Sequence, residues 1–263
     1  MSLRRAPWLL VVPGVVALAF LVIPLLALLG EAPWAGFGQI VATPEARDAL
    51  RLSLVTSVSA TAIAAVLGIP LAWLLAREVL PATGLIRALV LVPLLLPPVV
   101  SGVALLTAFG RRGPVGQVLY DAFGVQLPFT TAGVVLAEAF VAMPFLIITL
   151  EGGFRSLSRR YEEAAATLGA SGWLTFRRVT LAMVAPSLIA GLVLCWARAL
   201  GEFGATITFA GNFPGVTQTM PLAVYTALER DRSAAIALSV VLLSVSVAVL
   251  VALRGRYLRS GAS

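Results

Sequence analysis

An all-α membrane protein with about six transmembrane helices is the fold class that the sequence predicts, and three observations predict it. The chain has 263 residues, 60% of them hydrophobic, and a mean hydropathy of +1.00. Its apolar runs reach about 20 residues, which is enough to cross a bilayer core of about 30 Å. Such runs are too long for the roughly 10-residue strands of a barrel, and backbone groups in lipid must be satisfied within each segment, so each run is expected to be a helix.

The expected spans follow one another along the chain. They cover residues 7–29, 52–76, 86–109, 131–150, 186–210 and 234–253. The first span is longer than the apolar part of a signal peptide and no small-residue cleavage site follows it, so it is expected to be retained. We expect a single domain over residues 1–263, in which the longest connection is a cytoplasmic loop at about 151–185.

The arginines predict the orientation, because cytoplasmic loops collect positive charge. All 19 basic residues are arginines. The larger group falls on one side of the expected spans: Arg4, Arg5, Arg77, Arg87, Arg155, Arg159, Arg160, Arg177, Arg178, Arg254, Arg256 and Arg259. The smaller group, on the other side, is offset by acidic residues: Arg47, Arg51, Arg111, Arg112, Arg230 and Arg232. Both termini are therefore expected in the cytoplasm. The pI near 10.9 reflects this bias, and no nucleic-acid partner is expected.

Two residue types are missing from the chain, and their absence excludes several kinds of catalytic site. Histidine and lysine do not occur. A phosphate-binding loop needs lysine, so this chain is not expected to hydrolyse ATP itself. Catalytic triads, a histidine-based zinc site and a Schiff-base lysine are excluded in the same way. No catalytic residues and no metal site are predicted. Transport becomes the expected class, and the single cysteine, Cys195, cannot form an intrachain disulfide.

The most polar stretch lies in the longest loop and has the sequence YEEAAATLGASGWLTFRRV over 161–179. Four residues recur at helical spacing on one face: Tyr161, Ala164, Ala165 and Leu168. Ser158 is placed to cap this helix, Gly169 to end it, and Ser171 to cap a second, amphipathic helix. A helix this short is marginal alone. It is expected to pack either on its own bundle or in a groove of another protein.

The same stretch resembles the EAA signature of ABC-importer permeases, E-A-A-x3-G-x9-I-x-L-P. Glu163, Ala164 and Ala165 are followed by Gly169 at the family's spacing, then by Val179 and Leu181. Ala182 stands where the family usually has proline, and Pro186 follows four residues later. The resemblance implies that Tyr161, Glu163, Ala164, Ala165, Leu168 and Gly169 form a coupling helix seated on a separate cytoplasmic ATPase. ATP and Mg²⁺ would be bound by that partner, and this chain is expected to bind no cofactor.

A second set of motifs resembles oxyanion permeases of the molybdate, tungstate and sulfate group. The motifs are ARALGEFGAT at 197–206, FAGN at 209–212, PPVVSG at 97–102, GRRGP at 110–114 and PLAVYTALE at 221–229. Their sequences resemble those of molybdate permeases more closely, and tungstate and sulfate are the alternative substrates. The resemblance implies an inner-membrane, multi-pass subunit of type I importer architecture. It also implies a homodimer and a periplasmic or extracellular oxyanion-binding protein as a partner.

Candidate pathway residues come from the third and fifth expected spans: Pro97, Pro98, Ser101, Arg198, Glu202 and Thr206. Prolines and Gly102 interrupt the third span, and broken helices free backbone amides that can meet an anion. Arg198 and Glu202 are four residues apart, so they form either an internal ion pair that fixes packing or a charged element of the pathway. Glu138 is an alternative partner for Arg198. Glu138 and Glu202 also leave open a stand-alone, ion-coupled transporter.

Overall fold

The computed structural model describes residues 8–257, with side chains up to residue 252, and the elements in that part are helical. In chain order they are α1 (Trp8–Gly30), α2 (Phe37–Val41), α3 (Pro44–Ala76), α4 (Thr83–Leu95), α5 (Pro98–Phe109), α6 (Pro114–Phe123), α7 (Thr131–Ser156), α8 (Arg160–Thr167), α9 (Gly172–Thr175), the π-helical segment η1 (Phe176–Thr180), α10 (Leu181–Met183), α11 (Ala185–Leu200), α12 (Gly204–Ala210), α13 (Met220–Leu228) and α14 (Arg232–Tyr257). Arg4, Arg5 and Arg259 lie outside the described residues, as do Pro7 and the side chains of Arg254 and Arg256.

The predicted membrane fold is confirmed. Four helices are long and apolar enough to cross a membrane, namely α1, α3, α7 and α14, and up to six spans result if each of two bent helix pairs counts as one. The third predicted span is the pair α4 and α5, bent by 114°. The bend falls at Leu96, whose backbone is extended because Pro97 follows it. Pro93 lies within α4 and Gly102 within α5, and neither residue ends its helix.

The fifth predicted span, 186–210, is not one helix, and this corrects the expectation. Helix α11 ends at Leu200, and α12 begins only at Gly204. At the other end of α11, the segment 172–183 meets it at an angle of 77°. Pro186 lies in the first turn of α11, where its missing N–H costs nothing. The chain turns at Val184, between Ala182 and Pro186.

Helices α3, α7 and α11 form the centre of the bundle, and small residues let them approach closely. Gly68 of α3 lies against α7, where a Cβ at Gly68 would be 3.2 Å from Ile147 Cγ1. Gly191 of α11 lies against the same helix, with Leu146 Cδ1 3.0 Å from a Cβ there. Larger residues at these two positions would push the helices apart.

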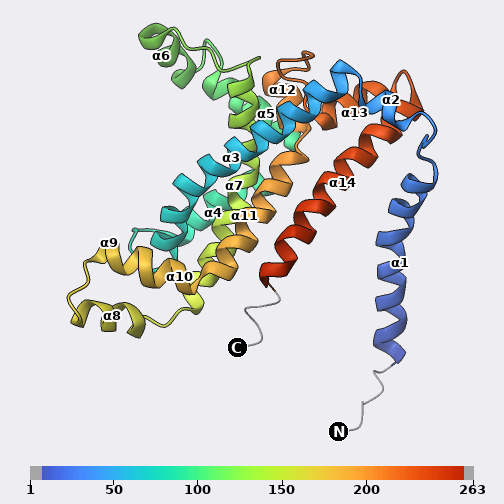
Figure 1. The fold of residues 1–263 in the computed structure, drawn as a ribbon. Helices are drawn as coiled ribbons and strands as arrows, with labels where there is room; N and C mark the ends of the chain where they lie inside the picture. Colours follow the sequence, from blue (N-terminus) through green and yellow to red (C-terminus); the bar gives the residue numbers. More distant parts are fainter. Residues whose placement is uncertain (1–7, 258–263) are drawn as a thin grey trace.

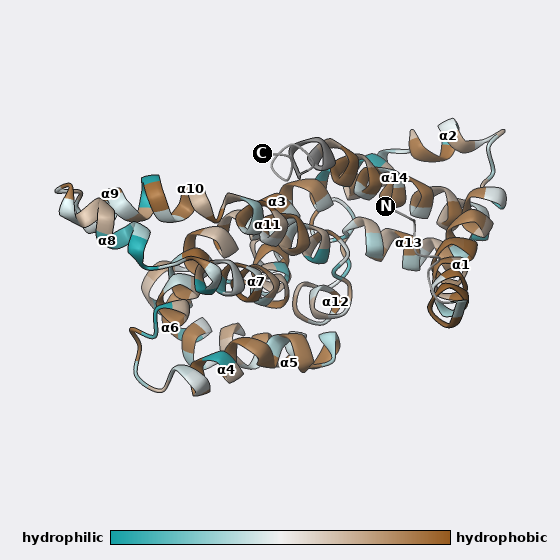
Figure 2. Cartoon of the chain, turned by 90° about the horizontal axis from the view of Figure 1, so that it is seen from below, coloured by the Kyte–Doolittle hydropathy of each residue, from teal (hydrophilic) through white to brown (hydrophobic). Residues whose placement is uncertain are grey.

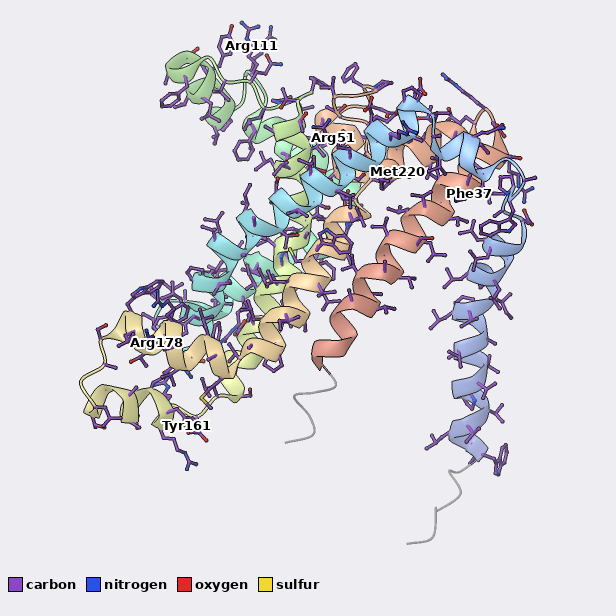
Figure 3. The ribbon with its side chains drawn as sticks, in the orientation of Figure 1. Phe37, Arg51, Arg111, Tyr161, Arg178 and Met220 are labelled. Atoms are coloured by element: carbon purple, nitrogen blue, oxygen red, sulfur yellow. The ribbon has the colours of Figure 1, made fainter. Side chains whose placement is uncertain are left out.

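The connections gather at two opposite ends of the bundle. Helices α8, α9 and α10 lie at one end, and α2, α6, α12 and α13 at the other (Figure 1). Figure 3 places Tyr161 and Arg178 at the first end and Arg51, Arg111 and Met220 at the second. Helix α1 stands at the side of the bundle with no buried residue. It is predominantly hydrophobic, whereas α8 carries a hydrophilic stretch (Figure 2).

Two adjacent glycines near the end of α7 provide a test of this packing. A methyl group on Gly153 would lie 2.6 Å from Ser187 Cβ of α11, whereas one on Gly152 meets nothing within 4 Å. We expect Gly153→Ala to destabilise the protein by about 1–3 kcal/mol through overpacking. Gly152→Ala is expected to be neutral or stabilising by up to about 1 kcal/mol, through helix propensity. Thermal unfolding of both variants in detergent measures the difference, and equal midpoints would contradict the close contact of α7 with α11.

Candidate translocation and coupling sites

Two short helices, α5 and α12, begin at the interruptions of the third and fifth predicted spans. Pro97 precedes α5 and Pro98 occupies its first turn, where the fixed backbone of proline suits a helix start. Phe203 precedes α12, and most of α12 is buried. Each interruption ends one ladder of backbone hydrogen bonds and starts another. At the start of α5 the two prolines have no N–H and Val100 N donates to the Pro97 carbonyl at 2.9 Å, and at the start of α12 Ala205 N donates to Glu202 Oε1.

Helices α5 and α12 pack directly against each other, at positions that only glycine permits. A Cβ on Gly102 would lie 2.6 Å from Thr208 Cβ and 2.9 Å from the carbonyl oxygen of Ala205. A Cβ on Gly204 would lie 2.7 Å from Pro98 Cβ. The PPVVSG and GEFGAT stretches, about a hundred positions apart in the chain, are therefore in contact. We call this contact, together with Ser101, Thr206, Arg198 and Glu202, the central site.

Two hydroxyl groups lie within the central site. Ser101 of α5 and Thr206 of α12 are both 0% exposed. Neither the Ser101 Oγ nor the Thr206 Oγ1 has a hydrogen-bond partner among the described residues. Both groups can therefore accept or donate a further hydrogen bond. Leaving a buried hydroxyl unpaired costs about 1–3 kcal/mol of folding free energy.

Arg198 and Glu202 pair with each other across the end of α11. Arg198 Nη1 lies 2.6 Å from Glu202 Oε2, and the side chain of Glu202 is 1% exposed while that of Arg198 is 26% exposed. The two residues do not share one helix face as expected, because α11 ends at Leu200. Instead Glu202 Oε1 accepts a hydrogen bond of 2.7 Å from the backbone N–H of Ala205. Glu202 thus joins the end of α11 to the first turn of α12.

Glu138 is not the partner of Arg198, which corrects the alternative proposed from the sequence. It lies on α7 and is 1% exposed. Its Oε1 accepts a hydrogen bond of 2.9 Å from Thr56 Oγ1 of α3. Its Oε2 has no hydrogen-bond partner among the described residues. The buried carboxyl therefore connects α3 to α7.

The structure brings five of the six candidate pathway residues together. Pro97, Pro98, Ser101, Glu202 and Thr206 all lie where α5 meets α12, or at the helix breaks beside it. The sixth, Arg198, is held beside them by its ion pair with Glu202. The side chains of Ser101, Thr206 and Glu202 are buried within the single chain.

The helix expected to couple to an ATPase is α8, at the opposite end of the bundle from α12. None of its residues is buried. Tyr161 is 47% exposed and Leu168 89% exposed, and Glu163 and Ala164 are exposed while Ala165 is half-buried. Leu168 caps α8 and does not lie in its last turn. The predicted face is therefore exposed in the single chain, apart from the half-buried Ala165.

The end of α8 forms as predicted, whereas its start does not. Gly169 has φ +82°, a left-handed conformation that glycine adopts without strain, and Ala170 N donates to the Ala165 carbonyl at 3.1 Å. Ser158 does not cap the helix with its side chain. Arg159 occupies that position, and Ser158 Oγ accepts instead from Arg160 Nε at 3.1 Å. Ser171 does cap α9 as predicted, accepting from Leu174 N at 3.3 Å.

Two residues at this end, Arg77 and Glu162, are not among the candidates that the sequence predicts. Glu162 of α8 accepts hydrogen bonds of 2.8 Å from Arg77 Nη2 and of 2.8 Å from Thr180 Oγ1, both at Oε1. Arg77 caps the C-terminus of α3, and its side chain is 8% exposed. Helical spacing pointed to the neighbouring face of α8, which carries Tyr161, Ala164 and Ala165, and a pairing over 85 residues leaves no local signal.

The fold and these two sites define an inner-membrane permease subunit of an ABC importer. The chain belongs to the family of binding-protein-dependent transport system inner membrane components, whose profile matches residues 64–260. Among named relatives it is 44% identical to the molybdenum transport system permease protein ModB of Mycobacterium tuberculosis, over 93% of this chain and 92% of that protein. It is 40% identical to ModB of Escherichia coli strain K12, over 81% of this chain and 92% of that protein.

Two further comparisons agree with this assignment. The sulfate transport system permease protein CysT of Escherichia coli strain K12 is 35% identical, over 88% of this chain and 84% of that protein. A crystal structure of a bacterial ABC transporter that imports alginate superposes with a TM-score of 0.73. That match covers 96% of this chain and 94% of the other at 17% identity, so it shows the fold alone. The predicted resemblance to ABC-importer permeases is confirmed: the chain is a multi-pass inner-membrane protein whose ATPase is a separate chain.

Proposed function

We propose that two copies of this chain form the pathway of an ATP-driven importer for molybdate. The observation that carries the substrate is the 44% identity to molybdenum permeases over nearly the whole chain. Sulfate is the alternative that the 35% identity to CysT supports, and tungstate is the closest chemical analogue. A homodimer fits the exposed valines on α5, Val99, Val100 and Val103, which give one copy an apolar face beside the central site.

The work is divided between chains. This chain binds neither ATP nor another cofactor and has no catalytic site, in agreement with its lack of lysine and histidine. A cytoplasmic ATPase binds ATP with Mg²⁺ and seats α8. A binding protein delivers the oxyanion at the end of the bundle where α6, α12 and α13 lie. When α5 and α12 separate, the unpartnered hydroxyls of Ser101 and Thr206 meet the anion.

Reconstitution tests this function. The permease, its ATPase and its binding protein are placed in liposomes, and uptake of labelled molybdate is measured with ATP inside. We expect uptake that requires ATP and the binding protein, that excess tungstate competes with, and that excess sulfate competes with weakly. Stronger competition by sulfate would reassign the substrate. Uptake without the ATPase would replace the proposal with an ion-coupled transporter that uses Glu138 and Glu202.

The proposed orientation places both termini and α8 in the cytoplasm. Labelling of single cysteines checks it, in a background in which the buried Cys195 is replaced by serine. Val79→Cys, at a residue 58% exposed between α3 and α4, is expected to resist an impermeant thiol reagent in intact cells. Arg112→Cys, beside α6, is expected to react. The reverse pattern would invert the topology.

A further inference from the structure

Helix α8 has few ways to transmit a movement to the membrane helices. It buries none of its residues, and it packs mainly on α9 and η1, which belong to the same loop. Its links to α3 converge on Arg77, which also donates to the Leu157 carbonyl at 3.4 Å and accepts from Arg159 Nη2 at its own carbonyl at 3.3 Å. We propose that Arg77 and Glu162 are the positioning residues that make α3 follow α8 during transport. This inference rests on the proposed function and identifies how its coupling helix acts.

One carboxylate oxygen joins three elements at this point. Glu162 Oε1, on α8, accepts from Arg77 Nη2 of α3 and from Thr180 Oγ1 of η1, each at 2.8 Å. The Arg77 side chain is 8% exposed and that of Glu162 is 21% exposed, so water screens the pair little. Charge-assisted hydrogen bonds are roughly twice as strong as neutral ones. A shift of α8 therefore acts on the end of α3 through this pair.

Helix α3 connects this end of the bundle to the other. It has 33 residues, Pro70 among them, which at 1.5 Å per residue corresponds to a length of about 50 Å. Along the helix, Thr56 donates to Glu138 of α7, and Ser53 Oγ accepts from Met220 N of α13 at 2.7 Å. Contiguous packed helices and hydrogen bonds of this kind carry coupling between distant sites. A movement imposed at Arg77 thus reaches the helices around the central site.

The link also has a second arrangement within reach. Arg77 gives Glu162 a single hydrogen bond, while its Nε has no partner among the described residues. Arginine and carboxylate form their strongest contact through two parallel bonds. A small displacement of α8 that brings the second carboxylate oxygen to Nε would exchange one arrangement for the other. Coupling requires an element with two states, whose equilibrium is shifted both by the ATPase contact at α8 and by the central site.

The test uses the complete complex in liposomes, with molybdate and the binding protein. The measured quantity is the amount of molybdate transported per ATP hydrolysed, beside the yield of assembled complex. Glu162→Gln and Arg77→Gln are each expected to assemble and to lower this ratio roughly tenfold, within the range typical of coupling between sites. The exchange of charges, Arg77→Glu with Glu162→Arg, is expected to recover much of the loss.

A matched control exists at the same end of the bundle. Arg87 of α4 pairs with Glu151 of α7 without contacting α8, so Glu151→Gln is expected to leave the ratio unchanged. Normal ratios in both single variants would overturn the inference, as would a loss of assembly that the exchanged pair does not restore. If the wild-type complex transports no oxyanion, the proposed function fails instead, and this outcome is read before any variant is made.

Discussion

Arg198→Gln is expected to destabilise the permease by about 3 kcal/mol, the lower end of the range for breaking a buried ion pair. The loss arises because the Glu202 side chain, 1% exposed, is left without the guanidinium that it pairs with. The lower end applies because 26% of the Arg198 side chain remains exposed. Thermal unfolding of the purified protein measures the effect. Arg155→Gln is the matched control: Arg155 also pairs at four residues' separation, with Glu151 at 3.7 Å, but its side chain is 56% exposed. There we expect about 1 kcal/mol or less.

A double variant separates packing from transport at this pair. Glu202 has a second role, since its Oε1 accepts from Ala205 N, and a glutamine at 202 retains an oxygen for that bond. Arg198→Leu with Glu202→Gln is therefore expected to recover most of the stability that Arg198→Gln loses. If transport also recovers, the pair is structural and does not belong to the pathway. If the protein is stable but transport stays low, the charge of Arg198 acts on the passing anion.

Ala165→Asp is expected to lower coupled transport by roughly 100-fold or more, because burying an unpaired charge costs several kcal/mol and each 1.4 kcal/mol is a factor of ten. In the single chain Ala165 is half-buried and lies on the open face of α8 beside Ala164. The ATPase is proposed to cover this face. Co-purification of the ATPase and molybdate uptake measure the loss.

The neighbouring residue supplies the control for this substitution. Ala166→Asp adds the same charge one position further along α8, about 100° around the helix from the proposed contact. It is expected to leave assembly and uptake close to those of the wild type. Equal losses at 165 and 166 would indicate that charge anywhere on α8 is harmful. Normal behaviour of both variants would make α8 an interfacial helix with no partner on that face.

The broken helices show where sequence patterns stop being informative. The prolines predicted an interruption in the third span, because proline restricts its own backbone and that of the residue before it. The break between α11 and α12 was missed, because the stretch from Ala197 to Thr206 is apolar enough to continue a helix. What ends α11 is partly local, since Gly201 caps it and Glu202 bonds to Ala205 N three residues further on. The tertiary part is the packing of Gly204 onto Pro98 of α5, which local patterns do not record.

The coupling loop was predicted more completely. Its landmarks are local, since Gly169 ends a helix through its own backbone conformation and Ser171 caps the next through a neighbour three residues away. Ser158 failed as a cap although it is a suitable residue type, because the helix starts one residue later and its hydroxyl binds Arg160. The spacing of the residues therefore predicted where the helix lies. How the helix starts depended on the Ser158 hydroxyl, which binds the Arg160 side chain and not the backbone of the first turn.

By itself the sequence predicted the class of this protein, from about six apolar spans, arginines biased to one side, no lysine for a phosphate-binding loop, and a stretch with the spacing of the EAA signature. These features can be predicted because they depend on the residues of each segment alone, through its solubility in lipid, its charge and its side-chain types. Only the tertiary structure decided which residues meet: Arg198 with Glu202, Thr56 with Glu138, Arg77 with Glu162, and Gly102 with α12. Most of these contacts join segments tens of residues apart, and their partners are selected by how closely the helices pack, which no local pattern records.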